Sequence, residues 1–369
     1  MQRRTFLKTA VAGAAGAAAA STLAAPAIAQ DVIRWRMVSA WPRNLPGPGV
    51  AAQMLADRIV TLSGGRIEIE FFAAGEVVPG PGVFDAVGEG TADIYHAVPA
   101  YWGSKSQGIL LFGSQPLGLN AIEQHGWMLH GGGQALYDEM YARFNLKPFL
   151  CGNSGPQWAG WFRNEINSLD DLRGLRYRTT GLNSVVMSKL GVAVEAMSGP
   201  AMFQALQSGA LDAGEFIGPW TDSTLGYQQV ADYYYDNGVG EPSSAEECAV
   251  NLDSWNSLPD DLKQAVEFAA ESLYNPVLTE YNTNHAKALR ELIAGGTQVR
   301  EWPQEIIIAM GNAMGEVMDE MLEDDDELVR RITESFLDYR NLMVEYMTHS
   351  ETAQLAAREL DFDYGGGNR

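Results

Sequence analysis

The chain has 369 residues, of which 46% are hydrophobic and 20% charged, a composition typical of globular proteins and a length that suits two lobes. Asp and Glu outnumber Lys and Arg by 47 to 25, and the formal net charge of −22 disfavours nucleic acid and anionic lipid as partners. No run of about 20 apolar residues occurs beyond residue 30, so no membrane-spanning helix is expected there.

Residues 1–29 are predicted to be an export signal. Arg3, Arg4 and Lys8 precede an alanine-rich apolar stretch, and residues 27–29 form a small-x-small cleavage site. The paired arginines followed by Thr-Phe-Leu-Lys indicate the twin-arginine type, with an ordinary export signal as the alternative. Without these three basic residues, 22 basic residues remain against 47 acidic ones, and the net charge becomes −25. We therefore expect an acidic mature protein in the periplasm.

The mature chain begins with a β-α-β pattern. The segment "VIRWRMVSAW" is predicted to be a strand, and "PGVAAQMLADRIVTLSGG" has helical spacing that stops at Gly64 and Gly65. The next segment, "RIEIEFF", alternates as a strand does. This order is typical of an open α/β sheet.

One motif occurs twice. Residues 84–93 and 203–212 both follow the pattern Phe-x-Ala-x-x-x-Gly-x-x-Asp, 119 residues apart. Each copy predicts the last turn of an amphipathic helix, a glycine that ends the helix, and a short strand. The repetition favours two lobes of similar build, with chance similarity as the alternative.

The remaining segments suggest where the chain changes lobes. Residues 152–156 are turn formers, "SLDDLRG" predicts a short helix and "LRYR" a strand, and long helices fill the C-terminal third. We predict an α/β fold with three parts after the signal. They are lobe 1 at residues 30–152 with a return segment near 244–282, lobe 2 at residues 153–243, and C-terminal helices at 283–369 that pack on both lobes.

Two charged residues stand at predicted strand ends. Glu215, in "GALDAGEFIGPW", follows a short apolar run, where burial of a carboxylate is costly unless a partner is present. Arg178 ends the "LRYR" strand, and a guanidinium there is a candidate clamp for a carboxylate. The alternatives are that Arg178 is a surface residue paired with Asp170 or Asp171, and that Glu215 packs against Arg178 without any metal.

The sequence offers little sign of catalysis. We find no CxxC or Cys/His cluster that would indicate zinc, no Ser–His arrangement and no phosphate loop. We therefore expect no enzyme, and keep a metal-assisted lyase or hydrolase with Glu215 or Glu241 as base as the alternative. Cys151 and Cys248 could form a disulfide in an oxidising compartment or remain separate thiols.

The order of several motifs resembles a known family. The export signal, "LRGLRYR", "QSGALDAGEFIGPW", "YYYDNGVGEP" and "WNSLPDDL" follow one another as in the substrate-binding proteins of tripartite ATP-independent periplasmic (TRAP) transporters. The resemblance covers essentially the whole mature chain and is closest to the branch that binds α-keto acids and related 2-oxo or 2-hydroxy carboxylates. It implies a two-lobed periplasmic binding protein fold, with a mixed sheet in each lobe and long C-terminal helices. It also implies capture of a small carboxylate and its delivery to a membrane permease.

The resemblance also implies a set of site residues. Arg178 corresponds to the arginine that clamps the ligand carboxylate. A bridging cation, Na⁺ or Ca²⁺, is implied at Gln157, Glu215 and the backbone carbonyl of Phe216, with Glu241 in the same site, and these oxygen ligands suit a hard cation. Close relatives often have Trp at the position of Phe216, which leaves the shape of the pocket wall open.

Three aromatic residues are candidate walls of the ligand pocket. Tyr101 can donate a hydrogen bond to a carboxylate or keto oxygen, Trp220 would cover the apolar end, and Trp41 is the third, with an ordinary core position as the alternative for each. The arginine clamp is shared by binding proteins for sugar acids, aromatic acids and ectoine-like ligands, so these remain alternative ligands. The helical region 275–292 is expected to mediate a homodimer, as in some relatives.

Overall fold

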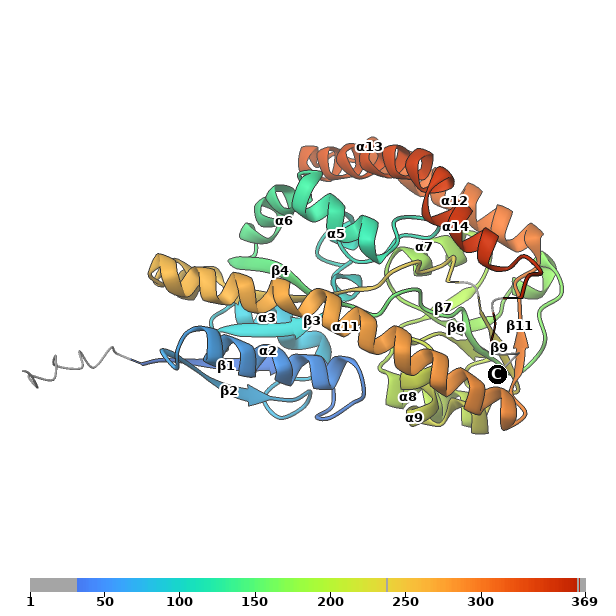
Figure 1. Ribbon diagram of the computed structural model, residues 1–369, viewed down its shortest axis with the longest axis horizontal. Coiled ribbons are helices and arrows are strands. Elements are labelled where there is room, and N and C mark those ends of the chain that lie inside the picture. Colours follow the sequence, from blue (N-terminus) through green and yellow to red (C-terminus); the bar gives the residue numbers. More distant parts are fainter. Residues whose placement is uncertain (1–31, 237, 364, 366–369) are drawn as a thin grey trace, which may run out of the picture. The chain divides into compact units, whose positions relative to one another are not determined.

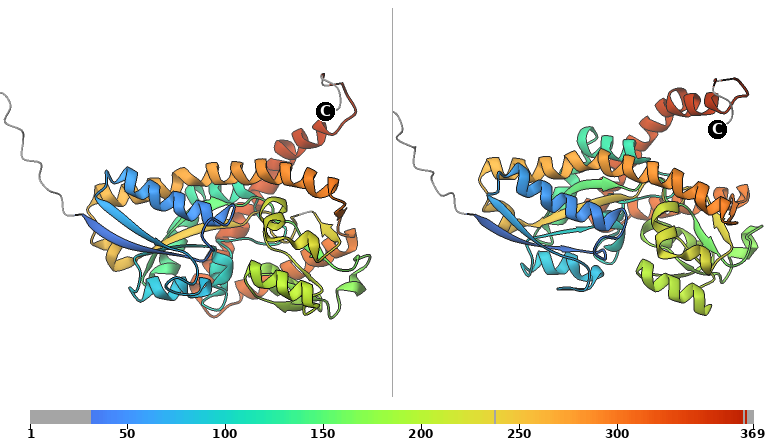
Figure 2. Two further views of the ribbon diagram at one scale, coloured as in Figure 1. Left: turned by 90° about the horizontal axis from the view of Figure 1, so that it is seen from below. Right: turned by 60° about the horizontal axis from the view of Figure 1, so that its bottom comes forward.

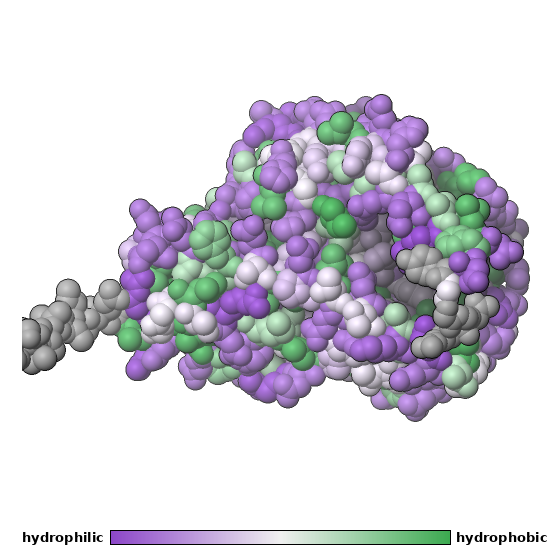
Figure 3. Space-filling model, viewed as in Figure 1, coloured by the Kyte–Doolittle hydropathy of each residue, from purple (hydrophilic) through white to green (hydrophobic). Residues whose placement is uncertain are grey.

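The computed structural model describes residues 32–236, 238–363 and 365. The predicted export signal at residues 1–29 lies outside these residues. Among the helices of the described residues, none is long and apolar enough to cross a bilayer. The face in Figure 3 is mostly hydrophilic with scattered apolar side chains, which agrees with the large excess of acidic residues.

The described residues from 33 onward contain two mixed sheets (Figure 1). The first sheet has the order β2-β1-β3-β10-β4. In it β1 and β3 are parallel, whereas β10 is antiparallel to both β3 and β4. Its strands are β1 (Ile33–Ser39), β2 (Ile67–Phe72), β3 (Ile94–Ala97), β4 (Leu146–Asn153) and β10 (Ala245–Asn251).

The second sheet has the order β11-β9-β5-β8-β6-β7. Parallel pairs join β6 to β7 and to β8, and β9 to β11, while β5 is antiparallel to β8 and β9. Its strands are β5 (Gly160–Phe162), β6 (Arg176–Arg178), β7 (Ala193–Glu195), β8 (Ala213–Gly214), β9 (Tyr233–Tyr235) and β11 (Gln298–Arg300). The predicted α/β fold with two mixed sheets is therefore confirmed.

The helices include three long ones near the C-terminus, as predicted. One of them, α11, packs against β4 and α2 beside the first sheet and against α9 beside the second, and Figures 1 and 2 show it running along both. The α-helices are α2 (Pro48–Leu62), α3 (Val83–Gly88), α4 (Gln107–Leu110), α5 (Ala121–His130), α6 (Gly133–Ala142), α7 (Gly181–Lys189), α8 (Gly199–Ser208), α9 (Pro219–Leu225), α10 (Leu252–Asn256), α11 (Asp260–Ala294), α12 (Gln304–Leu322), α13 (Glu327–His349) and α14 (Glu351–Arg358). The 3₁₀ turns are η1 (Gly80–Gly82), η2 (Pro99–Tyr101), η3 (Leu169–Leu172) and η4 (Tyr227–Gln229).

The repeated motif builds the same local structure in both sheets. In each copy a short helix, α3 or α8, is followed by a glycine at positive φ and then by a strand, β3 or β8. The glycines are Gly90 at φ 78° and Gly209 at φ 74°, a backbone conformation that costs glycine little. The predicted sequence of helix, glycine and strand is confirmed for both copies.

The aspartate that ends each copy makes the same pair of backbone contacts. The Asp93 N–H donates to Arg36 O at 2.9 Å, and Asp93 Oδ2 accepts from the Arg36 N–H at 2.8 Å. The Asp212 N–H donates to Arg176 O at 2.9 Å, and Asp212 Oδ2 accepts from the Arg176 N–H at 3.0 Å. Each contact adjoins a parallel ladder, β1 with β3 or β6 with β8. The motif therefore also sets strand pairing, which its spacing alone did not indicate.

Besides the passage through α11 from β10 to β11, the chain crosses between the sheets on two neighbouring segments. One segment joins β4 to β5 and the other joins β9 to β10. They are held together by hydrogen bonds from the Ser154 N–H to Ser244 O at 3.0 Å and from the Gln157 N–H to Glu241 O at 2.9 Å. The turn formers at residues 152–156 thus lie where the first crossing begins.

A buried carboxylate organises the core beneath the first sheet. Glu247 on β10 accepts hydrogen bonds from Trp102 Nε1 at 2.6 Å, Tyr141 OH at 2.7 Å and Tyr95 OH at 2.9 Å, and also from the Tyr137 hydroxyl. Four neutral donors replace the water that the carboxylate loses on burial. Sequence analysis did not identify this cluster.

The two cysteines are free and buried on adjacent strands, Cys151 on β4 and Cys248 on β10. Burial raises the pKa of the Cys151 thiol well above its usual value. Of the two alternatives left by the sequence, the structure therefore contains separate thiols.

Strands β5 and β8 of the second sheet approach each other closely at Gly160, and a substitution there can test this contact. Gly160 on β5 has φ 98°, and an added Cβ would overlap the carbonyl oxygen of Gly214. Gly174 has φ 73° but open space around it. We expect Gly174→Ala to lower the free energy of unfolding by about 1–2 kcal/mol, because alanine is strained at a positive φ even where space is available. Overlap should make Gly160→Ala costlier by roughly 1–3 kcal/mol. Urea unfolding compares the two variants, and equal losses would contradict the close approach at Gly160.

Candidate functional site

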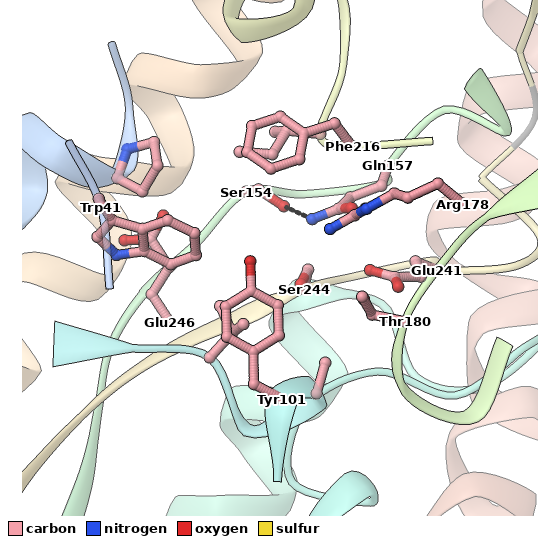
Figure 4. A pocket seen from close by; sticks show the side chains of 14 residues that line it. Trp41, Tyr101, Ser154, Gln157, Arg178, Thr180, Phe216, Glu241, Ser244 and Glu246 are labelled. Carbon is pink, nitrogen blue, oxygen red and sulfur yellow. Dashed lines mark hydrogen bonds between the residues drawn. The ribbon is translucent and has the colours of Figure 1, made fainter. Parts of the chain in front are cut away.

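A small cavity of about 20 Å³ lies at the crossing between the sheets (Figure 4). Trp41, just after β1, and Tyr101, at the end of η2, approach from the first sheet. Arg178, at the end of β6, and Phe216, just after β8, approach from the second. The crossing segments and their neighbours supply Ser154, Gln157, Glu241, Ser244 and Glu246. Strand ends therefore meet at this cavity, as expected for a ligand site in an open α/β fold.

Arg178 is buried, with only 2% of its surface exposed. Its Nε donates to Met197 O at 3.0 Å, and its Nη1 donates to the backbone oxygen of Glu215 at 2.6 Å. Nη1 also lies 3.3 Å from Glu215 Oε1, and the guanidinium carbon lies 5.3 Å from the centre of the Phe216 ring. These contacts hold a positive charge at the cavity wall.

The surface alternative for Arg178 is wrong. Asp170 instead lies 3.4 Å from Arg173, and the exposed Arg176 pairs with Asp212. The alternative prediction for Glu215 is that it packs against Arg178 without any metal, and the structure does contain this contact. That contact uses Oε1 and leaves the second carboxylate oxygen of Glu215 to face Gln157.

Four oxygen-bearing groups converge beside Arg178. One terminal amide atom of Gln157 lies 2.5 Å from Phe216 O, 3.1 Å from Glu241 Oε2 and 3.3 Å from Glu215 Oε2. That atom is placed as the amide oxygen, and Nε2 then donates to Ser154 Oγ at 3.2 Å (Figure 4). With the amide turned, nitrogen would donate to all three oxygens, and the amide oxygen would accept from Ser154 and Ser244.

The unturned amide is the arrangement that a hard cation favours. An amide oxygen, a backbone carbonyl and two carboxylates match the ligands of Na⁺ or Ca²⁺ and lack the nitrogen and sulfur that zinc prefers. The described residues contain no group of three or more His, Cys, Asp or Glu side chains with metal-binding geometry, and this set has only two carboxylates. The residues present therefore fit a cation held partly by a ligand or water.

Burying the negative charges of both Glu215 and Glu241 is unfavourable in the absence of a cation. Glu215 and Glu241 are 1% and 5% exposed, and Arg178 is the only cation paired with either among the described residues. Burial raises the pKa of Glu215 to about 7 against the lowering effect of the Arg178 charge. Burial and the Glu215 charge raise the pKa of Glu241 well above its usual value. A proton or a second cation must therefore offset one of the two charges.

Asp222 on α9 positions the Phe216 carbonyl. Its Oδ1 accepts from the Ile217 N–H at 3.2 Å and the Gly218 N–H at 3.1 Å. The N–H and C=O of a trans peptide point in opposite directions, so fixing the Ile217 N–H directs the Phe216 oxygen away from Asp222, toward Gln157. Asp222 Oδ2 accepts from Trp161 Nε1 and Tyr234 OH. Sequence analysis missed Asp222, although an acidic residue in the first turn after Gly218-Pro219 is a recognisable helix-start signal.

The three candidate wall residues lie in different places. Trp41 and Tyr101 both line the cavity, with ring centres 5.8 Å apart. Burial raises the pKa of the Tyr101 hydroxyl, and the nearby Arg178 charge acts in the opposite direction. Trp220 does not line the cavity: its ring packs against Tyr281, and its backbone N–H donates to His285 Nδ1 at 3.1 Å.

A larger cleft adjoins the cavity. Trp41, Tyr101 and Phe216 line both, and the cleft has a volume of about 730 Å³ with a mostly apolar wall. The three rings therefore separate the small polar cavity from a wider space between the first sheet and helices α7 and α8.

A family profile matches most of the chain. The family is described as "Bacterial extracellular solute-binding protein, family 7" (DctP), and the match covers residues 38–325. Among curated proteins, a monocarboxylate 2-oxoacid-binding periplasmic protein of Nostoc sp. is 39% identical over 293 residues, which span 79% of this chain and 80% of the relative.

Solved structures of TRAP solute-binding proteins are similar over nearly their whole length. One from Bordetella bronchiseptica, with copurified calcium and picolinate, has TM-score 0.86 and 33% identity, covering 89% of this chain and 97% of that chain. One from Pseudoalteromonas atlantica, with sodium and pyruvate, has TM-score 0.85 and 29% identity, covering 89% of this chain and 100% of that chain. One from Colwellia psychrerythraea, with calcium and pyruvate, has TM-score 0.85 and 30% identity, covering 88% and 99%.

Proposed function

This chain belongs to the bacterial extracellular solute-binding proteins of family 7, and from that premise we propose that it captures a small 2-oxo monocarboxylate in the cavity at the crossing of its two sheets. It is a periplasmic binding protein of the TRAP type for a carboxylate, and its family consists of transport proteins rather than enzymes. The metal-assisted lyase or hydrolase alternative is therefore set aside.

The observation that carries the proposal is the buried guanidinium of Arg178 beside oxygens of Glu215, Phe216 and Glu241 that converge on the Gln157 amide. A 2-oxo acid has carboxylate and keto oxygens on adjacent carbons. Arg178 would take the carboxylate with charge-assisted hydrogen bonds, and Tyr101 would donate to a carboxylate or keto oxygen. The alternative ligands are another carboxylate, namely a sugar acid, an aromatic acid or an ectoine-like ligand, which could extend into the adjoining cleft of about 730 Å³. The relatives with bound pyruvate support a 2-oxo acid as the ligand class.

We further propose that Na⁺ or Ca²⁺ binds at Gln157, Glu215, Glu241 and the carbonyl oxygen of Phe216. A cation there would offset the surplus negative charge of the two glutamates and attract the oxygens of the ligand. Without it, Glu215 and Glu241 would repel an anion. The support comes from the oxygen ligand set and from the relatives that contained calcium or sodium together with a carboxylate.

The lobe boundaries and the later steps of transport are also proposals. Residues 30–152 with 244–282 and residues 153–243 would be the two lobes, which close around the ligand before delivery to the TRAP permease. The helices at 283–369 would pack on both. The pairing of the two crossing segments supports this division, because both segments lie at the proposed boundary between the lobes.

The homodimer through residues 275–292 stays a prediction. Within this stretch Val277, Leu278, Tyr281, Ala288 and Leu292 are buried in the chain itself, so a partner would have to use the other face of α11. A dimer structure of the Bordetella bronchiseptica relative supports the idea. Light scattering should give twice the mass of the mature chain, and a monomer mass across micromolar concentrations would reject the dimer.

Replacing Arg178 should remove carboxylate binding. Arg178→Ala deletes the desolvated cation, so pyruvate binding should weaken by about 2–5 kcal/mol, or at least ~30-fold in Kd. Arg176→Ala, two residues earlier on the same strand, is the matched control because Arg176 is exposed and paired with Asp212. Calorimetry measures Kd and circular dichroism checks folding. Equal pyruvate affinity of folded Arg178→Ala and the unmodified protein would remove Arg178 from the site.

Cation removal and Glu215→Gln should weaken pyruvate binding together. Glu215→Gln keeps the shape of the side chain and removes its charge, so calcium or sodium affinity and pyruvate affinity should both fall by at least tenfold. Glu165→Gln is the control, because that carboxylate pairs with Arg300 at the surface. Dialysis of the unmodified protein against chelator in sodium-free buffer should reproduce the loss, and added cation should reverse it. Undiminished pyruvate affinity under both treatments would show that Glu215 is only a partner of arginine.

A further inference from the structure

Glu246 is a buried acidic residue that lines the cavity and has no part in the proposed arginine or cation contacts. It is the second residue of β10, and Ser244, just before the strand, lines the same cavity. Only 2% of Glu246 is exposed. In Figure 4, Glu246 and Trp41 lie on one side of the cavity, and Arg178, Gln157 and Glu241 lie on the opposite side.

One oxygen of Glu246 is held and the other has no partner. Oε1 accepts a hydrogen bond from Tyr281 OH at 2.8 Å. Oε2 is buried and makes no hydrogen bond within the part of the chain that the structure describes. It faces His96 Nε2 at 3.5 Å, and that nitrogen also lacks a hydrogen-bond partner. Gly152 on β4 makes room for this placement, because a Cβ there would lie 2.7 Å from Oε2. Unpaired buried polar atoms at a cavity wall are unusual and costly.

His96 cannot neutralise Glu246. Trp41 Nε1 donates to His96 Nδ1 at 2.9 Å, so Nδ1 is the acceptor and the ring proton is on Nε2. Burial lowers the pKa of His96 to about 3, which keeps the ring neutral. Among the ion pairs of the described residues, no Lys or Arg reaches Glu246. The side of the cavity next to Trp41 is therefore acidic, whereas the opposite side carries Arg178.

We propose that Glu246 sets ligand selectivity at the end of the cavity away from Arg178, where it admits an apolar or hydrogen-bond-donating group and rejects a second carboxylate. This inference rests on the proposed function, because it assumes that Arg178 holds the first carboxylate. With that end fixed, the rest of a short ligand extends toward Trp41 and Glu246. A second carboxylate there would meet an ionised Glu246 with little water and no cation between them, where like charges repel strongly. Glu246 is thus the residue that would exclude 2-oxo acids with a second carboxylate from the site.

The test compares two ligands of the same chain length. 2-Oxoglutarate and 2-oxopentanoate each have five carbons and differ in whether the far end is a carboxylate or a methyl group. Calorimetry is done at pH 8, since burial raises the pKa of Glu246 to about 7 and the group is then mostly ionised. Pyruvate is measured in parallel as the reference ligand.

The unmodified protein should prefer 2-oxopentanoate to 2-oxoglutarate, and Glu246→Gln should narrow that preference by at least tenfold while pyruvate affinity changes less than about threefold. Glu247→Gln is the matched control, because it removes the same charge one residue away, in a cluster that does not line the cavity. It should leave the preference unchanged. Glu246→Ala serves as a second neutral variant if Glu246→Gln does not fold.

An unchanged preference in folded Glu246→Gln or Glu246→Ala would overturn the proposal. So would the failure of both five-carbon ligands to bind any variant, because length rather than charge would then exclude the dicarboxylate. If the unmodified protein bound no 2-oxo acid at all, pyruvate included, the proposed function itself would fall. The pyruvate reference therefore separates the two failures.

Discussion

The burial of two carboxylates beside a single guanidinium is the constraint on which the site depends. Removing each ion from water costs several kcal/mol, and Arg178 can offset one negative charge but not both. Glu215 and Glu241 lie where the chain crosses between the sheets, with the Gln157 amide and the Phe216 carbonyl beside them. The charges of the cluster are therefore balanced only with a second positive partner, a proton or a cation. The acidic surface of the chain adds no such charge.

The buried acidic residues of this protein differ in how completely they are satisfied. Glu247 and Asp222 each accept four hydrogen bonds from neutral donors, which makes them supports for the core and for the strand end that carries Phe216. Glu215, Glu241 and Glu246 border cavities and lack such a set. These three glutamates are the functional candidates, since a ligand or an ion can supply the hydrogen bonds or positive charge that the protein does not provide.

Two features of the fold hold the site together. The crossing segments are hydrogen-bonded to each other at Ser154–Ser244 and at Gln157–Glu241, so site residues from both segments keep a common register. The repeated aspartates, Asp93 and Asp212, set the pairing of the parallel strands whose ends approach the cavity. The strand ends that carry Arg178 and Phe216 are thus placed by hydrogen bonds to the backbone of neighbouring strands.

Local sequence patterns were enough to predict many helices and strands and the repeated motif, because strand ends and helix-ending glycines are set by neighbouring residues. They also identified Arg178 and Glu215 as charged residues at strand ends. The family resemblance added Gln157, Phe216 and Glu241, and the structure brings all five together. Only the tertiary structure decided that Arg178 is buried, that Trp220 lies apart from the cavity, and that Asp222, His96 and Glu246 border or support the site. Those contacts depend on the order of strands in two sheets and on the path between them. Most of them join residues that are far apart in the sequence, such as Trp41 with His96 and Trp161 with Asp222, and no local periodicity specifies which residues meet.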